Sequence, residues 1–237
     1  MTDIPSSPSK PRPIRPRDAA SLILLDRTGN TPRILMGRRH SGHAFMPSVM
    51  VFPGGRVEPA DRSMSAYGTL SVHAERGLLT RVVRPSPAKA RALALCAIRE
   101  TFEETGILLG ETGLGTPPVS SEHWRAFADH EVFPSPESLH FVARAITPPA
   151  MKRRFDTRFF VADARSIAHQ TDGVVGPDSE LVETKWLTFD EARSEDLVWI
   201  TRTILDEVAR RLEIGLEKDV PVPFYREQRG VRSREEI

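Results

Sequence analysis

Three acidic residues stand close together in the stretch RETFEETG at residues 99–106. On a helix, the spacing of Glu100, Glu103 and Glu104 places their carboxylates on one face within a single turn. Like charges at this spacing repel one another, and the C-terminal end of a helix is unfavourable for anions. Carboxylate oxygens are the ligands that Mg²⁺ prefers. The spacing therefore favours a metal site, and an ordinary solvated acidic face is the alternative.

A glycine turn followed by acids lies upstream, in FPGGRVEPAD at residues 52–61. Together with RETFEETG it resembles the signature of Nudix hydrolases, in which a glycine, five residues, an acid and a spacer precede R-E-apolar-x-E-E-x-G-apolar. Asp61 stands where that family has Glu, and Thr101 takes an apolar position. The spacer, 62–98, is thirty residues longer than the usual seven. The residues that fall on the motif are Gly54 and Gly55 of the turn, then Arg99, Glu100, Glu103, Glu104, Gly106 and Ile107.

The resemblance implies an α/β fold, an α/β/α sandwich around a mixed β-sheet. It also implies metal-dependent hydrolysis of a nucleoside diphosphate linked to another group, with Mg²⁺ or Mn²⁺ as the cofactor. A diphosphate is polyanionic, so attack by water requires charge neutralisation and an activated nucleophile, and metal ions supply both. In this scheme Arg99 orients a glutamate, and a catalytic base stands on the helix or on a later loop. The expected metal ligands are Glu100, Glu103 and Glu104, and the candidate bases are Glu100, Glu180 and Glu183.

A narrower resemblance concerns the substrate. The stretches RRHSGHAFMPSVMVFPGGRVEPAD (38–61) and RFDTRFFVA (154–162), with the long spacer, resemble acyl-CoA and CoA diphosphatases that carry an interrupted motif. Those enzymes produce 3′,5′-ADP and (acyl-)4′-phosphopantetheine, and Arg38, Arg39 and Arg56 would suit such an anionic substrate. The alternatives are an ADP-ribose, NADH or other dinucleotide pyrophosphatase, and a Nudix-fold module that binds a nucleotide without cutting it.

The hydrophobic pattern predicts how the chain is organised. Residues 1–17, rich in proline and arginine, are expected to form a disordered arm, 18–215 the catalytic domain and 216–237 a loose polar tail. Within the domain, residues 62–88 are predicted to be a cap over the substrate. Cys96 and the three tryptophans, Trp124, Trp186 and Trp199, are expected to pack in the interior. Strands are expected at 19–27, 32–39, 48–52, 138–147, 157–164 and 181–189, and helices at 88–105, 120–133 and 195–215, with a short one inside 62–87.

Composition limits the class of protein. The 237 residues are 39% hydrophobic and 27% charged, as expected for a globular domain. A formal net charge of +1 gives no reason to expect nucleic acid or a membrane as partner. The longest apolar run, ALALCAI (92–98), is too short to cross a bilayer, and the N-terminus has no apolar signal core. We therefore expect a cytoplasmic enzyme with a small nucleotide diphosphate as its partner, and a homodimer is left open.

Overall fold

A mixed β-sheet organises the computed structural model, which describes residues 14–42, 47–228 and 230–237. The central strand β1 (Arg17–Asp26) runs parallel to β8 (Phe155–Asp163) and antiparallel to β2 (Arg33–Arg39). Two short strands, β3 (Met50–Val51) and β4 (Gly54–Arg56), pair with β2 and β1. Across the sheet the order is β10 (Leu181–Thr188), β2, β1, β8, β7 (His140–Ile146), β11 (Pro223–Gln228) and β12 (Val231–Glu236). A smaller sheet contains β6 (Phe133–Pro134), β5 (Ile107–Glu111) and β9 (Ile167–Gln170).

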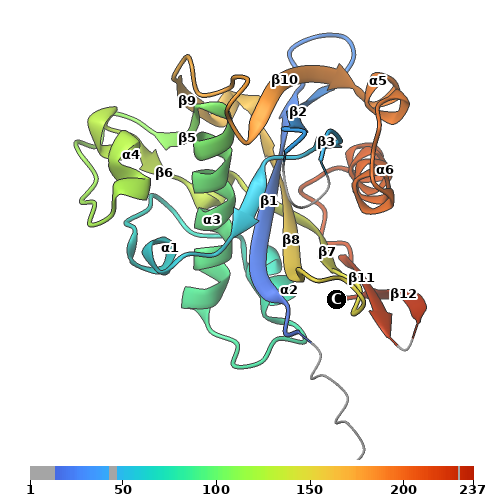
Figure 1. Cartoon of the computed structure of the whole chain (residues 1–237). Coiled ribbons are helices and arrows are strands. Elements are labelled where there is room, and N and C mark those ends of the chain that lie inside the picture. Colours follow the sequence, from blue (N-terminus) through green and yellow to red (C-terminus); the bar gives the residue numbers. More distant parts are fainter. Residues whose placement is uncertain (1–13, 43–46, 229) are drawn as a thin grey trace, which may run out of the picture.

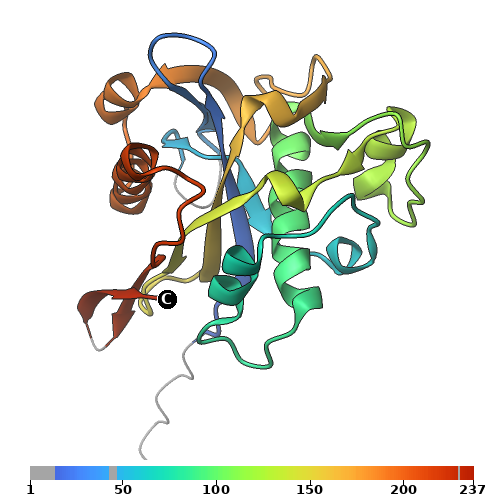
Figure 2. The ribbon, with the colours of Figure 1, turned by 180° about the vertical axis from the view of Figure 1, so that it is seen from behind.

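Helices cover both faces of the large sheet (Figures 1 and 2). Helix α3 (Pro87–Thr105) lies on one face, and α5 (Phe189–Ser194) and α6 (Trp199–Ile214) lie on the other. Each interface encloses its own cluster of buried apolar side chains. The predicted α/β/α sandwich around a mixed sheet is therefore confirmed. The remaining helices are short: α1 (Pro59–Ser63), α2 (Val72–Leu79), α4 (Arg125–Asp129), and the 3-10 turns Glu122–Trp124, Pro136–Ser138 and Ala164–Ser166.

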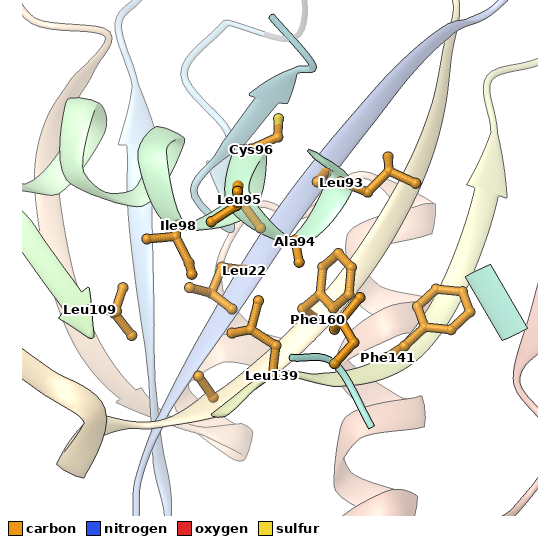
Figure 3. Packing of buried hydrophobic residues seen from close by; sticks show 14 of the residues in the cluster. Leu22, Leu93, Ala94, Leu95, Cys96, Ile98, Leu109, Leu139, Phe141 and Phe160 are labelled. Atoms are coloured by element: carbon orange, nitrogen blue, oxygen red, sulfur yellow. The ribbon is translucent and has the colours of Figure 1, made fainter. Parts of the chain in front are cut away.

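Helix α3 is held in place along its length. The Ser86 hydroxyl accepts a hydrogen bond from the Lys89 N–H, which caps the first turn. The helix ends at Gly106, whose φ of 75° is left-handed and whose missing Cβ would lie 2.2 Å from the Thr171 carbonyl oxygen. Its apolar face packs on β1 and β8, where Leu93, Ala94 and Ile98 meet Leu22 and Phe160 (Figure 3). This packing fixes the helix end that carries the three glutamates.

The insertion within the motif is not a cap. Met64, Leu70, Ala74 and Leu78 are buried in the same cluster as the apolar face of α3. Helix α2 packs on α3 and on β7, and none of residues 62–88 belongs to the described lining of the large cavity. The prediction of a substrate-facing cap was wrong because these apolar side chains extend the core.

The C-terminal residues form a β-hairpin. Strand β11 pairs in parallel with β7, with Phe224 opposite Arg144, and β12 folds back on β11 at the sheet edge (Figure 1). Phe224 is buried, and charged side chains such as Arg226 and Glu235 neutralise each other across the hairpin. The prediction of a loose tail over 216–237 was wrong because cross-strand ion pairs account for much of its polar composition.

The other predicted elements mostly agree with the structure. The helix expected at 120–133 is shorter, since the chain turns after Asp129 and enters β6. Residues 1–13 of the predicted arm lie outside the described residues, and Arg17 already begins β1. Cys96 is buried as expected, and burial raises the pKa of its thiol. Within the described part of the chain, no helix has the length and apolar character needed to span a bilayer.

Candidate active site

A cavity of about 730 Å³ lies against the sheet and reaches from the glycine turn to the C-terminal hairpin. This volume is in the range of small-molecule binding sites. One end is lined by Gly54, Gly55 and Glu100 of the motif, together with Arg39 and Glu180. The rest of the lining includes Phe52, Met151, Phe155, Phe159, Trp199 and Tyr225 among apolar and aromatic residues, and Arg56, Arg153, Arg226 and Arg232 among cations.

Arg99 joins the two halves of the split motif. Its buried guanidinium donates to Asp61, with Nε 2.7 Å from Oδ1 and Nη2 3.0 Å from Oδ2. It also donates to Glu100 Oε1 at 2.9 Å and to Glu103 Oε2 at 2.6 Å. Asp61 in turn accepts from the Glu58 N–H at 2.8 Å, which closes the first turn of α1. A single arginine therefore orients two glutamates and ties the glycine loop to the helix despite the 62–98 spacer.

Two of the three helix glutamates press against the glycine turn. A Cβ on Gly55 would lie 2.4 Å from the Glu100 carboxyl carbon, so only glycine permits this approach. Glu104 is 5% exposed, and its Oε2 accepts from the Gly54 N–H at 3.1 Å. Burial raises the pKa of Glu104 well above its usual value, and the charges of Glu180 and Glu100 raise it further. Burial likewise raises the pKa of Glu100 to about 7, against the opposing effect of Arg99.

The later loop contributes one of its two candidate bases. Glu180 lines the cavity, and its Oε1 is 3.6 Å from Arg39 Nη2. Glu183 is instead paired with Arg38 at 3.3 Å and Lys185 at 3.0 Å, outside the described lining of the cavity. The position of Glu180 thus favours it over Glu183, a choice that the sequence left open.

The acidic residues suit a divalent cation by their chemistry. Among the described residues, no group of three His, Cys, Asp or Glu side chains already stands in ligating positions, so binding requires side-chain rotation. Besides burial, the charge of Glu180 raises the pKa of both Glu100 and Glu104, because like charges lie near one another here and Arg99 and Arg39 offset them only in part. A divalent cation relieves such repulsion and uses the oxygen ligands present. The donor set of Glu100, Glu104 and Glu180 therefore fits the metal.

Glu103 has other partners. Its Oε2 accepts from Arg99, and its Oε1 is 2.7 Å from Nδ1 of His123, which is half exposed. No sequence pattern singles out His123, because it belongs to the 3-10 turn Glu122–Trp124, outside the motif. Of the three predicted metal ligands, Glu103 is therefore the one whose carboxylate contacts a histidine.

The predicted basic contacts divide into two groups. Arg39 and Arg56 line the cavity, and Arg56 also pairs with Glu58 at 2.6 Å. Arg38 is outside the described lining, since its Nη2 donates to Glu195 at 2.8 Å and its Nε to Glu183. We therefore do not retain Arg38 as a substrate contact.

Residues that the sequence did not predict also line the cavity. Trp199 was expected to pack, yet it is 41% exposed and forms part of the wall. Arg226 and Arg232 lie in the C-terminal hairpin, in the segment predicted to be a loose tail. The hydrophobic pattern within one element could not place these two arginines in the cavity wall, because their position depends on β11 pairing with β7.

The raised pKa of Glu100 predicts how stability depends on pH without metal. A carboxyl with a raised pKa keeps its proton to a higher pH in the folded state than in the unfolded state. Stability is therefore lost as the pH rises from 4.5, the usual pKa of a glutamate, to about 7, the pKa of Glu100 in the folded protein. The loss is on the order of 3 kcal/mol. In EDTA, the Tm of the unchanged protein should fall across this window more steeply than that of Glu100→Gln. Parallel Tm curves would contradict the assignment.

Several known proteins that resemble this chain are diphosphatases or hydrolases by name. The chain is 28% identical to the human acyl-coenzyme A diphosphatase NUDT19 over 86% of its own length and 71% of the relative. It is 34% identical to the chicken protein of that name over 56% of this chain and 43% of the relative. A crystal structure of a Nudix hydrolase from Alicyclobacillus acidocaldarius matches with a TM-score of 0.62 at 25% identity, covering 86% of this chain and 96% of that one. No protein-family model matches the chain.

Proposed function

We propose that this chain, a member of the Nudix hydrolase family that resembles the acyl-CoA diphosphatases, cleaves CoA and acyl-CoA in a metal-dependent reaction. The products would be 3′,5′-ADP and (acyl-)4′-phosphopantetheine. Hydrolysis of a phosphoanhydride bond is the activity of the family, and the choice of CoA and of Mg²⁺ or Mn²⁺ is the proposal.

The reassembled motif is the observation that carries this proposal. The Arg99–Asp61 pair brings Gly54 and Gly55 onto the glutamates of α3, although 37 residues separate the two stretches along the chain. Glu100, whose pKa burial raises to about 7, then lines one end of a substrate-sized cavity, and the buried Glu104 lies against the Gly54 N–H beside it. A structural acidic face would be solvated and would have no need of a glycine turn pressed against it.

The side chains at this end divide the work of hydrolysis. A divalent cation, when bound, supplies charge neutralisation for the diphosphate and lowers the pKa of water. Glu100, Glu104 and Glu180 would hold it. Glu100 and Glu180 both line this end of the cavity, so either can accept a proton from water where it does not ligate the cation. Arg39 and Arg56 line the same cavity and would offset the negative charge of the phosphates.

The choice of CoA rests on two considerations. Two relatives that align with 86% and 75% of this chain are acyl-coenzyme A diphosphatases by name. The cavity also extends far beyond the glutamates and combines an apolar wall with several cations, as a long substrate with both apolar and anionic parts requires. ADP-ribose, NADH and other dinucleotides share the diphosphate, so only product analysis separates them from CoA.

A substrate panel tests the proposal. Purified protein with Mg²⁺ or Mn²⁺ is incubated with CoA, acetyl-CoA, ADP-ribose, NADH and a diadenosine polyphosphate, and the products are identified by mass. We expect 3′,5′-ADP from CoA and acetyl-CoA at the highest kcat/KM, and no product in EDTA. Preference for ADP-ribose or NADH would overturn the CoA assignment. Binding without cleavage of any compound would instead indicate a non-catalytic nucleotide-binding module.

A further inference from the structure

The end of the cavity beyond the motif is built by two elements that the catalytic motif does not include. They are the first turn of α6, with Trp199, and the C-terminal hairpin, with Tyr225, Arg226 and Arg232. Strand β11 lies three strands from β1, a separation of about 14 Å at the usual spacing of 4.8 Å between strands. Side chains reaching inward from both ends shorten that span to one that a nucleotide bridges.

Trp199 is the aromatic group of this second end. A tryptophan is large and apolar, so a ring that is 41% exposed inside a cavity offers a surface for a flat ligand. The guanidinium carbon of Arg232 lies 4.7 Å from the centre of its ring. Arg232 covers one face of the indole, and this arrangement of an aromatic ring beside a guanidinium suits a base that carries a phosphate.

Arginines accompany this ring in the cavity wall. Arg226 and Arg232 of the hairpin line the cavity together with Glu227, and Arg153 lines the same cavity. Arg226 is paired with Glu235 at 2.5 Å, but Arg232 is 3.9 Å from Glu227, beyond hydrogen-bond distance, and is largely exposed. The charge of Arg232 is therefore weakly compensated and available to an anionic ligand.

We infer that the first turn of α6 and the C-terminal hairpin bind the 3′-phosphoadenosine half of the substrate, an inference that rests on the proposed function. Trp199 stacks on the adenine, and Arg232, with Arg153, binds the 3′-phosphate. The pantetheine half carries neutral amides and needs no cations, so the arginines favour the nucleotide half at this end. The hairpin then distinguishes CoA from nucleotides that lack a 3′-phosphate.

Comparison of CoA with dephospho-CoA tests the phosphate contact. In Arg232→Ala the ratio of kcat/KM for CoA to that for dephospho-CoA should fall about tenfold, mainly through a higher KM for CoA, since a charge-assisted hydrogen bond is lost. Arg234→Ala removes an arginine from the same strand but outside the described lining, so it should keep the original ratio. An unchanged ratio in Arg232→Ala would overturn the inference.

Trp199 provides a second measurement that needs no turnover. In metal-free protein, 3′,5′-ADP should quench tryptophan fluorescence more strongly than 4′-phosphopantetheine does. The Trp199→Phe variant should lose this quenching. It should still bind 3′,5′-ADP more tightly than the Trp199→Ala variant, because phenylalanine keeps an aromatic ring. Loss of the ring in Trp199→Ala should raise the KM for CoA and dephospho-CoA alike, by about tenfold. Quenching by 4′-phosphopantetheine alone would assign this end to the other half of CoA. If the substrate panel shows no CoA cleavage, the proposed function fails, and 3′,5′-ADP binding still decides this inference separately.

Discussion

Glu104→Gln should lower kcat/KM by about a thousandfold, because several kcal/mol of transition-state charge stabilisation is lost and each 1.4 kcal/mol is a factor of ten. The amide has the shape of the carboxyl, and its oxygen can still accept the Gly54 N–H that now lies 3.1 Å from Glu104 Oε2. What the variant lacks is the negative charge that would bind the cation. Steady-state kinetics with CoA across a range of Mg²⁺ concentrations measures the effect, and extra Mg²⁺ should not restore the rate.

The stability of the same variant separates a lost ligand from a damaged fold. Without metal, its Tm should equal or exceed that of the unchanged protein, since burial and the charges of Glu100 and Glu180 disfavour the Glu104 carboxylate. Addition of Mg²⁺ or Mn²⁺ should raise the Tm of the unchanged protein, whereas the Tm of Glu104→Gln should not change. Glu122→Gln, at an 84% exposed side chain, is the matched control and should behave as the original. A variant that keeps its turnover, or its metal-induced shift, would remove Glu104 from the proposed site.

The catalytic helix could be predicted from the sequence because its determinants are local. Ser86 and Pro87 mark its start, Gly106 marks its end, and the spacing of the glutamates fixes which side of the helix they share. The motif also implied that Arg99 orients a glutamate, and the structure has Arg99 donating to two. The distribution of roles among the glutamates depended on neighbours that are distant along the chain, such as His123 for Glu103.

The rest of the site could not be predicted because it depends on long-range pairing. Leu70 and Leu78 belong to a segment whose sequence predicts an insertion over the substrate. They are buried because α2 packs on α3. In the sequence, Arg232 is one of many charged residues near the C-terminus. Its position over the Trp199 ring follows from the pairing of β11 with β7 and of β12 with β11. The strands of this two-stranded hairpin are too polar to be recognised from a hydrophobic pattern, because charged residues such as Arg226 and Glu235 pair across it. Sequence reasoning therefore singled out residues at the glutamate end of the cavity and missed those at the opposite end.

Arg99→Met should reduce the free energy of unfolding by about 3–5 kcal/mol, the cost of breaking a buried ion pair by removing one partner. Asp61 is fully buried, so without Arg99 its carboxylate would keep only the Glu58 N–H as a described partner. Activity should fall as well, by about a hundredfold, because Glu100 and Glu103 lose the donor that orients them. Urea denaturation and CoA kinetics on the same preparation measure the two effects.

A second substitution decides whether the Arg99–Asp61 pair is what unites the split motif. In Asp61→Asn with Arg99→Met no buried charge is stranded, so the double variant should be more stable than the sum of the two single changes predicts. Its activity should nevertheless stay low, since Glu100 and Glu103 then lack the arginine that orients them, and the Gly54 N–H bond to Glu104 remains as a contact between the glycine loop and the helix. Arg211→Met breaks another buried pair, with Glu207, outside the described lining of the cavity, and it should cost stability while kcat/KM is retained. If the two single losses at Asp61 and Arg99 simply add, the ion pair does not couple the two halves of the motif, and packing of α1 on α3 must hold them together instead.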